Sequence, residues 1–251
     1  PIAEAHKQGF LHIHDLSHPI VGYCAGWSLE DLIREGFNSD NSNIYCKPPK
    51  HLRTLYKQIN NFLFTLANEW AGAQAFNSVD TYSAGYIKHE NLSDEEVYDL
   101  LEGLVYDLNV KTRHGSQTPF TNFSFDLTVP DDMRGRPVMI GDTEADFTYG
   151  DCQEEMDRFN KIFTDIMTGG DGKGKPFTFP IVTYSITDKF PWGSDLSKAI
   201  FTFADECNSP YFSNFINSDN DPSDVRSMCC RLRLDLTQLI NSGGGLFGSG
   251  D

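Results

Sequence analysis

Long helical patterns alternate with short β-favouring runs along this chain, and this alternation limits its fold more than any other feature. Apolar residues recur every three or four positions in four stretches, which are residues 52–70, 97–108, 156–167 and 196–203. A capping box, Ser93 followed by Glu96, begins the second stretch, and Gly169 with Gly170 ends the third. We therefore expect four amphipathic helices, each with one face against a core.

Aromatic and β-branched residues gather in runs that we expect to be strands. These runs are residues 10–13, 20–27, 123–129 and 177–186. Strands separated by long helices predict an α/β fold with mostly parallel pairing. Residues 131–151 have the composition of a surface excursion, and residues 169–175 that of a glycine-rich turn into a strand. Because no linker divides the chain, we expect residues 1–251 to form a single domain.

The composition excludes several classes of protein. The chain carries 36 acidic and 20 basic side chains, a formal charge of −16, so we expect no nucleic-acid or membrane partner. No apolar run approaches the ~20 residues of a membrane span, and no secretory signal is visible. The six cysteines include no C-x-x-C pair, which favours thiols in a reducing, cytoplasmic compartment. The chain begins inside a helical pattern and ends in a glycine-rich one, so we expect it to be part of a longer protein.

The first candidate site is the sequence His12-Ile13-His14-Asp15. In a strand, His12 and His14 would point to the same face, because side chains alternate with a period of two. Two imidazoles with a nearby carboxylate can bind a metal ion or orient a polar substrate. The alternative is a strand end that carries solvated histidines.

The second candidate site is the loop of residues 113–120, which contains Ser116, Gln117 and Thr118 and joins a predicted helix to a predicted strand. Backbone N–H groups and small hydroxyls in such a loop can hold an anion. The loop lacks the P-loop pattern of glycines followed by Lys and Ser or Thr, so no Walker-type nucleotide site is implied. The alternative is a connecting loop without a ligand.

The third candidate site is the adjacent pair Cys229 and Cys230, which is flanked by Arg226 and Arg231. Neighbouring guanidinium groups favour the thiolate form, and with it thiolate or radical chemistry rather than inert burial. The alternative is two thiols packed at the start of a helix. For Cys46, Cys152 and Cys207 we expect small, buried hydrophobic side chains.

Taken in chain order, these segments resemble one family, the class III or anaerobic ribonucleoside-triphosphate reductases. The resemblance begins with residues 6–16 (HKQGFLHIHDL) and 23–27 (YCAGW). It continues through residues 115–120 (GSQTPF), 169–180 (GGDGKGKPFTFP), 228–231 (MCCR) and 244–248 (GGLFG). A single motif of this kind is weak, whereas several in the right order over nearly the whole chain are specific.

The resemblance implies a fold and two catalytic cysteines. The family has a ten-stranded α/β barrel made of two parallel five-stranded halves, and this chain would be the amino-terminal part of it. By motif position, Cys230 matches the finger-loop cysteine that becomes a thiyl radical, and Cys24 matches the second active-site cysteine of many members. Many members have Gly in place of Cys229, and spacing alone leaves open which of the adjacent cysteines carries the radical.

The family's chemistry implies a role for each thiol. Cys230 would take the 3′ hydrogen atom of the ribose, after which the 2′ oxygen leaves as water, and Cys24 would donate hydrogen and an electron from the opposite side. Formate is the usual overall reductant, and some members use a small redox protein. The residues that the resemblance places near the substrate or its triphosphate are His12, His14, Asp15, Ser116, Gln117 and Thr118.

The resemblance also implies parts and partners outside this chain. They are an amino-terminal ATP cone, a carboxy-terminal glycyl-radical loop and a structural zinc site with four cysteines, so this chain alone is expected to be inactive. Activation would need S-adenosylmethionine and an activase that contains an iron–sulfur cluster. We also expect dNTP and ATP effectors and a homodimer, with residues 52–70 and 97–113 as candidates for the dimer face.

Three other functions compete with the reductase. Adjacent cysteines are also typical of glycyl-radical acyltransferases and lyases such as the pyruvate formate-lyase group, although the His-Ile-His-Asp and Tyr-Cys-Ala-Gly-Trp sequences follow the reductase pattern. A non-catalytic nucleotide- or sugar-binding α/β module would use its cysteines only for packing. A structural metal protein would use His12, His14 and Cys24 as ligands.

Overall fold

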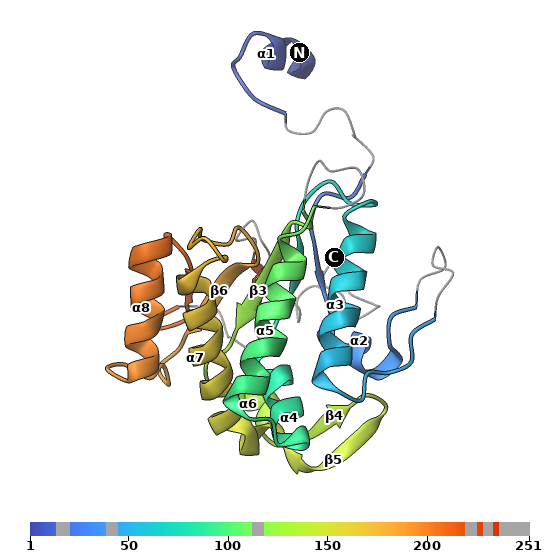
Figure 1. Ribbon diagram of the computed structural model, residues 1–251. Helices are drawn as coiled ribbons and strands as arrows, with labels where there is room; N and C mark the ends of the chain where they lie inside the picture. Colours follow the sequence, from blue (N-terminus) through green and yellow to red (C-terminus); the bar gives the residue numbers. More distant parts are fainter. Residues whose placement is uncertain (14–20, 39–44, 112–117, 219–224, 228–232, 236–251) are drawn as a thin grey trace.

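Five parallel strands, paired in the order in which they occur along the chain, form the central sheet of the computed structural model (Figure 1). The structure describes residues 1–13, 21–38, 45–111, 118–218, 225–227 and 233–235. The five strands are β1 (Ala25–Trp27), β2 (Gln74–Phe76), β3 (Thr121–Phe125), β6 (Ile181–Ile186) and β7 (Tyr211–Asn214). Each strand is therefore added at the same edge of the growing sheet.

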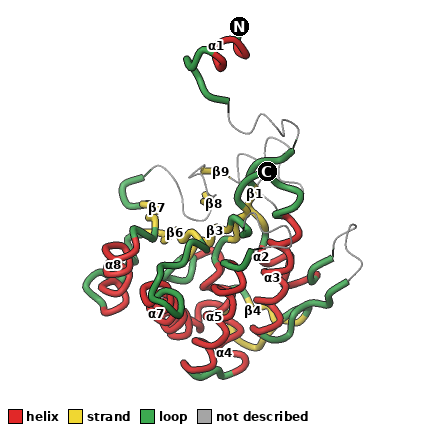
Figure 2. Tube along the Cα trace, turned by 45° about the horizontal axis from the view of Figure 1, so that its top comes forward, coloured by secondary structure: helices red, strands yellow, loops and turns green. Residues whose placement is uncertain are grey.

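The helices that connect these strands lie on one face of the sheet, and Figure 2 shows them below the row of strands. They are α2 (Leu29–Glu35), α3 (Leu52–Leu66), α4 (Val79–Glu90), α5 (Asp94–Leu108), α7 (Gln153–Gly169) and α8 (Asp195–Cys207). Crossovers between parallel strands are right-handed, so strands added always at one edge place every connecting helix on the same face. This is the winding of an α/β barrel, whereas a doubly wound sheet reverses its strand order and carries helices on both faces.

The four predicted helices are confirmed as α3, α5, α7 and α8, although α3 ends at Leu66 rather than at residue 70. The capping box of α5 is formed: the Ser93 hydroxyl accepts the backbone N–H of Glu96, and the Glu96 carboxylate accepts that of Ser93. Helix α7 ends at Gly169, and Gly170 follows it with φ of 71°. A residue with a side chain is strained at such a φ, which explains the glycine there.

Helix α4 was not predicted. Every residue from Val79 to Ile87 is buried, so this helix has no polar side and shows no amphipathic stripe in the sequence. It lies between α7 and the segment that follows β3, and Gly85 allows the close approach of Val138: a Cβ on Gly85 would lie 2.5 Å from a Val138 methyl group.

The prediction that residues 131–151 form a surface excursion is wrong. This segment contains α6 (Asp131–Arg134), β4 (Pro137–Ile140), β5 (Thr143–Thr148) and the 3-10 helix η1 (Tyr149–Cys152). Strands β4 and β5 form an antiparallel hairpin, and its residues Val138, Met139 and Ile140 are buried. Two of the residues that suggested a loop, Gly135 and Gly141, lie at the turns on either side of β4, whereas Pro137 lies within that strand.

The predicted strands differ from the observed ones in length and, in one case, in kind. Residues 10–13 are not a strand; they follow α1 (Ile2–Lys7), which stands apart from the sheet in Figures 1 and 2. Strand β1 contains only the last three residues of the strand predicted at 20–27. Strand β6 begins at Ile181 rather than at residue 177. Strand β3 ends at Phe125 because Leu127 has φ of 63° and turns the chain.

A second hairpin is formed by β8 (Val225–Ser227) and β9 (Arg233–Asp235), which pair antiparallel with Val225 opposite Asp235. Figure 2 draws this hairpin on the side of the sheet away from the helices. The segment that joins the two strands, residues 228–232, contains Cys229 and Cys230 and lies outside the described residues.

Aromatic packing holds the sheet to its helices. The ring of Phe125 on β3 lies 5.4 Å from that of Phe159, 4.9 Å from that of Phe163 and 5.4 Å from that of Tyr184, measured between centroids. All four side chains are fully buried. Within the described part of the chain, no helix has the length and apolar character needed to cross a bilayer.

Candidate active site

The face of the sheet opposite the helices is polar. Phe123 and Phe125 of β3 point toward the helices, and side chains alternate along a strand, so Asn122 and Ser124 point the other way. On the neighbouring strand β6, Thr183 lies opposite Ser124 and shares its face. We call this the polar face. This face also contains apolar residues, since Gly26 on β1, Ala75 on β2 and Ile181 on β6 lie in one row with Asn122.

The polar face contains buried groups that lack hydrogen-bond partners. Asn122 is 0% exposed, and neither atom of its side-chain amide has a partner among the described residues. Ser124 is 6% exposed, and its hydroxyl likewise has none there. An unpaired buried polar group costs about 1–3 kcal/mol, so such groups are typical of surfaces that a further ligand or segment completes. No local sequence signal marks Asn122 and Ser124, because their importance depends on the face of the sheet that they occupy.

Cys24 lies at the amino end of β1, directly before Ala25. The period of two along an extended chain places it on the same face as Gly26, which is the polar face. Its side chain is half-buried, and its sulfur accepts the backbone N–H of Ala73 at 3.3 Å. By contrast, Cys152 is packed in the core, where burial raises the pKa of its thiol to about 12 and keeps it protonated.

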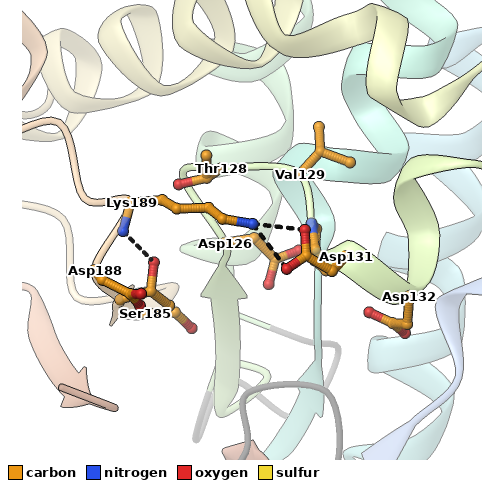
Figure 3. Close-up of a pocket in the computed structure, with 10 residues that line it drawn as sticks. Asp126, Thr128, Val129, Asp131, Asp132, Ser185, Asp188 and Lys189 are labelled. Carbon is orange, nitrogen blue, oxygen red and sulfur yellow. Dashed lines mark hydrogen bonds and ion pairs between the residues drawn. The ribbon is translucent and has the colours of Figure 1, made fainter. Parts of the chain in front are cut away.

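A pocket of about 310 Å³ opens where β3 and β6 end (Figure 3). The side chains that line it include Asp126, Thr128, Ser185, Thr187, Asp188 and Lys189. Asp126 and Ser185 continue the polar face, two residues beyond Ser124 and Thr183. The carboxyl ends of parallel strands are the usual place for ligands in α/β folds, so the polar face leads into an accessible site.

One wall of this pocket is held by a salt bridge between α6 and the segment that follows β6. The Lys189 ammonium group donates to both oxygens of Asp131, at 2.6 and 2.7 Å, as Figure 3 shows. Lys189 thereby holds the pKa of Asp131 below its usual range, with a smaller contribution from Arg134. Because both side chains are largely exposed, this ion pair positions the wall more than it stabilises the fold.

The turn after β3 is anchored by Asp80 of α4, which is 0% exposed. Its carboxylate accepts the backbone N–H groups of Thr81, Asp126 and Leu127 and the side-chain amide of Asn160. Burial raises the pKa of Asp80, and these four donors oppose that effect. The Thr81 hydroxyl donates to Asp126 at 2.6 Å, so α4 fixes the position of a carboxylate that lines the pocket.

Only some of the predicted site residues lie in the described part of the structure. Cys24 lies on the polar face, and Thr118 is half-buried just before β3. His12 is exposed in an irregular segment, with its ring centroid 5.5 Å from that of His6. The prediction of a strand that aligns His12 with His14 is wrong at His12, and His14 lies outside the described residues. The predicted site residues outside the described part are His14, Asp15, Ser116, Gln117, Cys229 and Cys230.

No group of three or more His, Cys, Asp or Glu side chains suited to a metal ion occurs within the residues that the structure covers. The ligand set proposed for a structural metal protein includes His14, which lies outside that coverage. Cys24, another member of that set, has the Ala73 N–H as its described neighbour.

A parallel sheet whose strands are added in one direction, with the connecting helices on one face, is the architecture of part of an α/β barrel. Residues 1–250 match the family model of anaerobic ribonucleoside-triphosphate reductase, and the chain belongs to this family. This assignment agrees with the resemblance inferred from the sequence motifs and leaves the acyltransferase or lyase without support.

Curated relatives match about half of this chain. This chain is 26% identical over 151 residues to the anaerobic ribonucleoside-triphosphate reductase of Salmonella typhimurium. The aligned region is 50% of this chain and 21% of that protein. The reductase of Escherichia coli gives the same values. That of phage T4 is 22% identical over 148 residues, or 49% of this chain and 24% of the relative. The chain thus spans about a fifth of the length of these relatives.

Solved structures show the same fold. The anaerobic ribonucleotide reductase of Thermotoga maritima in complex with dATP and CTP aligns with a TM-score of 0.66 and 21% identity, over 87% of this chain and 37% of that one. The same enzyme with MES in its active site aligns with a TM-score of 0.67 over 86% of this chain. The predicted α/β fold, as part of a barrel, is confirmed.

Proposed function

We propose that this chain forms part of the catalytic barrel of an enzyme that reduces ribonucleoside triphosphates to 2′-deoxyribonucleoside triphosphates. The observation that carries the proposal is Cys24 on the polar face of a sheet of this family's fold, with the Cys229–Cys230 pair between β8 and β9. The Thermotoga relative, which is described in complex with dATP and CTP, supports nucleotides as substrates and effectors.

In this proposal each cysteine has one role. Cys230, as a thiyl radical, takes the 3′ hydrogen atom, so its S–H bond forms as the ribose C–H bond breaks. The 2′ hydroxyl then takes a proton and leaves as water while the 3′ hydroxyl gives up its proton, and Cys24 gives a hydrogen atom to carbon 2′, which leaves a 3′ ketone and a Cys24 thiyl radical. Formate returns a hydrogen atom to Cys24, passes its second electron to the ketone, which also takes up a proton, and becomes carbon dioxide. Cys230 then returns its hydrogen atom to carbon 3′ and is again the thiyl radical. A small redox protein is the alternative reductant.

The polar face would hold the ribose during these steps. Asn122 and Ser124 supply unpaired amide and hydroxyl groups, which match the donors and acceptors of a sugar. The residues proposed to line the substrate and triphosphate pockets remain His12, His14, Asp15, Ser116, Gln117 and Thr118. Cys229 is the alternative carrier of the radical.

The remaining parts of the enzyme are proposed from the family. A glycyl radical, stored outside this chain, supplies the thiyl radical after activation by an S-adenosylmethionine-dependent activase with an iron–sulfur cluster. A structural zinc site, dNTP and ATP effectors and a homodimer complete the proposal, within a single catalytic domain that includes residues 1–251 and acts in the cytoplasm. Helices α3 and α5 are the candidates for the dimer face.

The test uses the intact enzyme with its activase, under strict anaerobiosis. We expect Cys24→Ala and Cys230→Ala to reduce deoxyribonucleotide formation to background, because each removes a thiol that exchanges hydrogen with the substrate. Cys229→Ala is expected to retain activity. Cys207→Ala serves as a matched control, since that thiol lies on α8 against the carbonyl of Met167.

Three outcomes would contradict the proposal. Substantial product from the Cys230→Ala enzyme would remove the hydrogen-abstracting role from that residue, and loss of product only in Cys229→Ala would transfer the role to its neighbour. Turnover that depends on coenzyme A, without nucleotide reduction, would instead identify the acyltransferase or lyase.

A further inference from the structure

We propose that Gly72 positions the sulfur of Cys24, by leaving the space in which that sulfur meets a backbone N–H group. Gly72 would thus be a positioning residue for the reductase reaction. The inference rests on the role proposed above for Cys24, and it concerns residues that the structure describes directly.

The segment that carries Cys24 runs beside the segment that leads into β2. The N–H of Ala71 donates to the carbonyl of Gly22 at 3.0 Å, and that of Gly72 donates to the carbonyl of Tyr23 at 2.6 Å. Further along, the N–H of Ala25 donates to the carbonyl of Ala73 at 3.1 Å. These bonds extend the pairing of β1 with β2 backward to the cysteine.

The pairing contains an irregularity at the cysteine. Ala25 lies opposite Gln74, and in an uninterrupted parallel ladder with this register Ala73 would donate its N–H to the carbonyl of Tyr23. Gly72 makes that bond instead, so the N–H of Ala73 is left for another acceptor. Its acceptor is the Cys24 sulfur, at 3.3 Å. The one-residue slip therefore directs a hydrogen-bond donor at the thiol.

Only glycine fits beside this contact. A Cβ on Gly72 would lie 2.7 Å from the Cys24 sulfur and 2.6 Å from the Tyr23 carbonyl oxygen, both far inside van der Waals contact. The backbone of Gly72 is outside the left-handed region, so the position requires glycine for space and not for conformation. A methyl group there would force the sulfur away from the Ala73 N–H.

The strand cannot easily move aside to relieve such a clash. Gly22 is packed under the ring of Trp70, where a Cβ on Gly22 would lie 2.5 Å from a ring carbon. Trp70 in turn packs edge-on against Trp27, with ring centroids 5.6 Å apart. Because tryptophan rings fix both ends of the segment, the clash must be relieved between them, where both the Tyr23 carbonyl group and the Cys24 sulfur have to move.

A displaced sulfur would react poorly. Hydrogen transfer requires the two heavy atoms to approach closely in one orientation, and a misplacement of ~1 Å can cost about 10²-fold in rate. A sulfur held by an N–H donor keeps one orientation without a bound substrate. The pair Gly72 and Ala73 would therefore preorganise the thiol.

The experiment compares Gly72→Ala with Gly169→Ala in the intact enzyme. The control adds the same methyl group at the last residue of α7, where it meets nothing within 4 Å. We expect Gly72→Ala to lower kcat by about 10²-fold with little change in KM, and Gly169→Ala to lower neither. We also expect the pH at which Cys24 is half-maximally alkylated by iodoacetamide to rise, because the N–H donor no longer stabilises the thiolate.

A double-mutant cycle tests the contact without turnover. The loss of unfolding free energy caused by Gly72→Ala should be smaller in a Cys24→Ala background, because the clash with the sulfur is absent there. An unchanged kcat and alkylation profile, together with no coupling in the cycle, would overturn the inference. Full activity of Cys24→Ala would instead overturn the role proposed for that thiol, while the alkylation profile and the cycle would still report on the contact.

Discussion

The two faces of strand β3 carry side chains of opposite character, although their residues alternate along five consecutive positions. On one face Phe123 and Phe125 pack against the helices and are fully buried. On the other, Asn122 and Ser124 are equally hidden from water but have unpaired polar atoms within the described structure. Burial of a Phe contributes roughly 1.5–3 kcal/mol and an unpaired polar group costs about 1–3 kcal/mol, so the helix-covered face offsets the cost of the polar one. One face of the strand therefore supplies stability, and the proposed substrate site lies on the other.

The largest effect on stability is expected from Phe125→Ala, which removes a side chain from the helix-covered face. The substitution leaves a cavity among Phe159, Phe163 and Tyr184, and such losses cost about 3–5 kcal/mol of unfolding free energy. Urea denaturation followed by circular dichroism measures the loss. A cost below ~1 kcal/mol would mean that this face does not supply the stability assigned to it.

A smaller effect of opposite sign is expected from Asn122→Ala on the polar face. Removal of an amide without partners should leave the unfolding free energy unchanged or raise it by about 1 kcal/mol, while nucleotide reduction falls. The matched control is Asn160→Ala. This asparagine is also fully buried, but it donates to Asp80 and to the Met156 carbonyl, so its loss should cost about 1–3 kcal/mol. Equal destabilisation by both substitutions would contradict the claim that the Asn122 amide does not stabilise the fold.

The smallest effect is expected from Glu30→Gln on α2, which lies away from both faces of β3. Burial raises the pKa of Glu30, but hydrogen bonds from Arg136 and Arg34 outweigh it and leave the pKa below its usual range. A carboxyl group whose pKa is lowered in the folded state stabilises the fold above its unfolded pKa, and this contribution is lost as the pH falls through the folded pKa. Wild type should therefore lose slightly more stability than Glu30→Gln between pH 7 and pH 3, by under ~1 kcal/mol because the arginines are partly exposed. Thermal unfolding at the two pH values measures this difference, and an identical loss in both proteins would contradict it.

The sequence patterns predicted helices best where one side of the helix faces solvent. Helices α3 and α7 have such a side, and α5 also carries its own start signal in Ser93 and Glu96. Helix α4 has no exposed side, so no periodicity could reveal it. Strands β1 and β2 are three residues long, and pairing with distant segments rather than local pattern defines them.

The candidate thiols could be selected from the sequence, whereas the residues that surround Cys24 could not. Cys24 could be selected from a motif because the residues that identify it are adjacent in the sequence. Asn122 acquires its position from pairing with Ala75 and Ile181, and Asp80 from contacts with residues more than 40 positions away along the chain. Tertiary contacts of this kind leave no trace in local composition, and the same applies to the slip at Gly72.

The strand order has a consequence for synthesis on the ribosome. Every strand of the sheet pairs with the strand that preceded it in the sheet, so no strand has to insert between two that are already joined. Each β-strand and its following helix can dock as soon as they emerge, and the order of translation coincides with the order of assembly. In the described sheet, one edge of the growing assembly is then always its newest strand, and the other is β1. A pause in translation would leave these two edges exposed but no gap between strands inside the sheet, which limits the opportunity for intermolecular strand pairing.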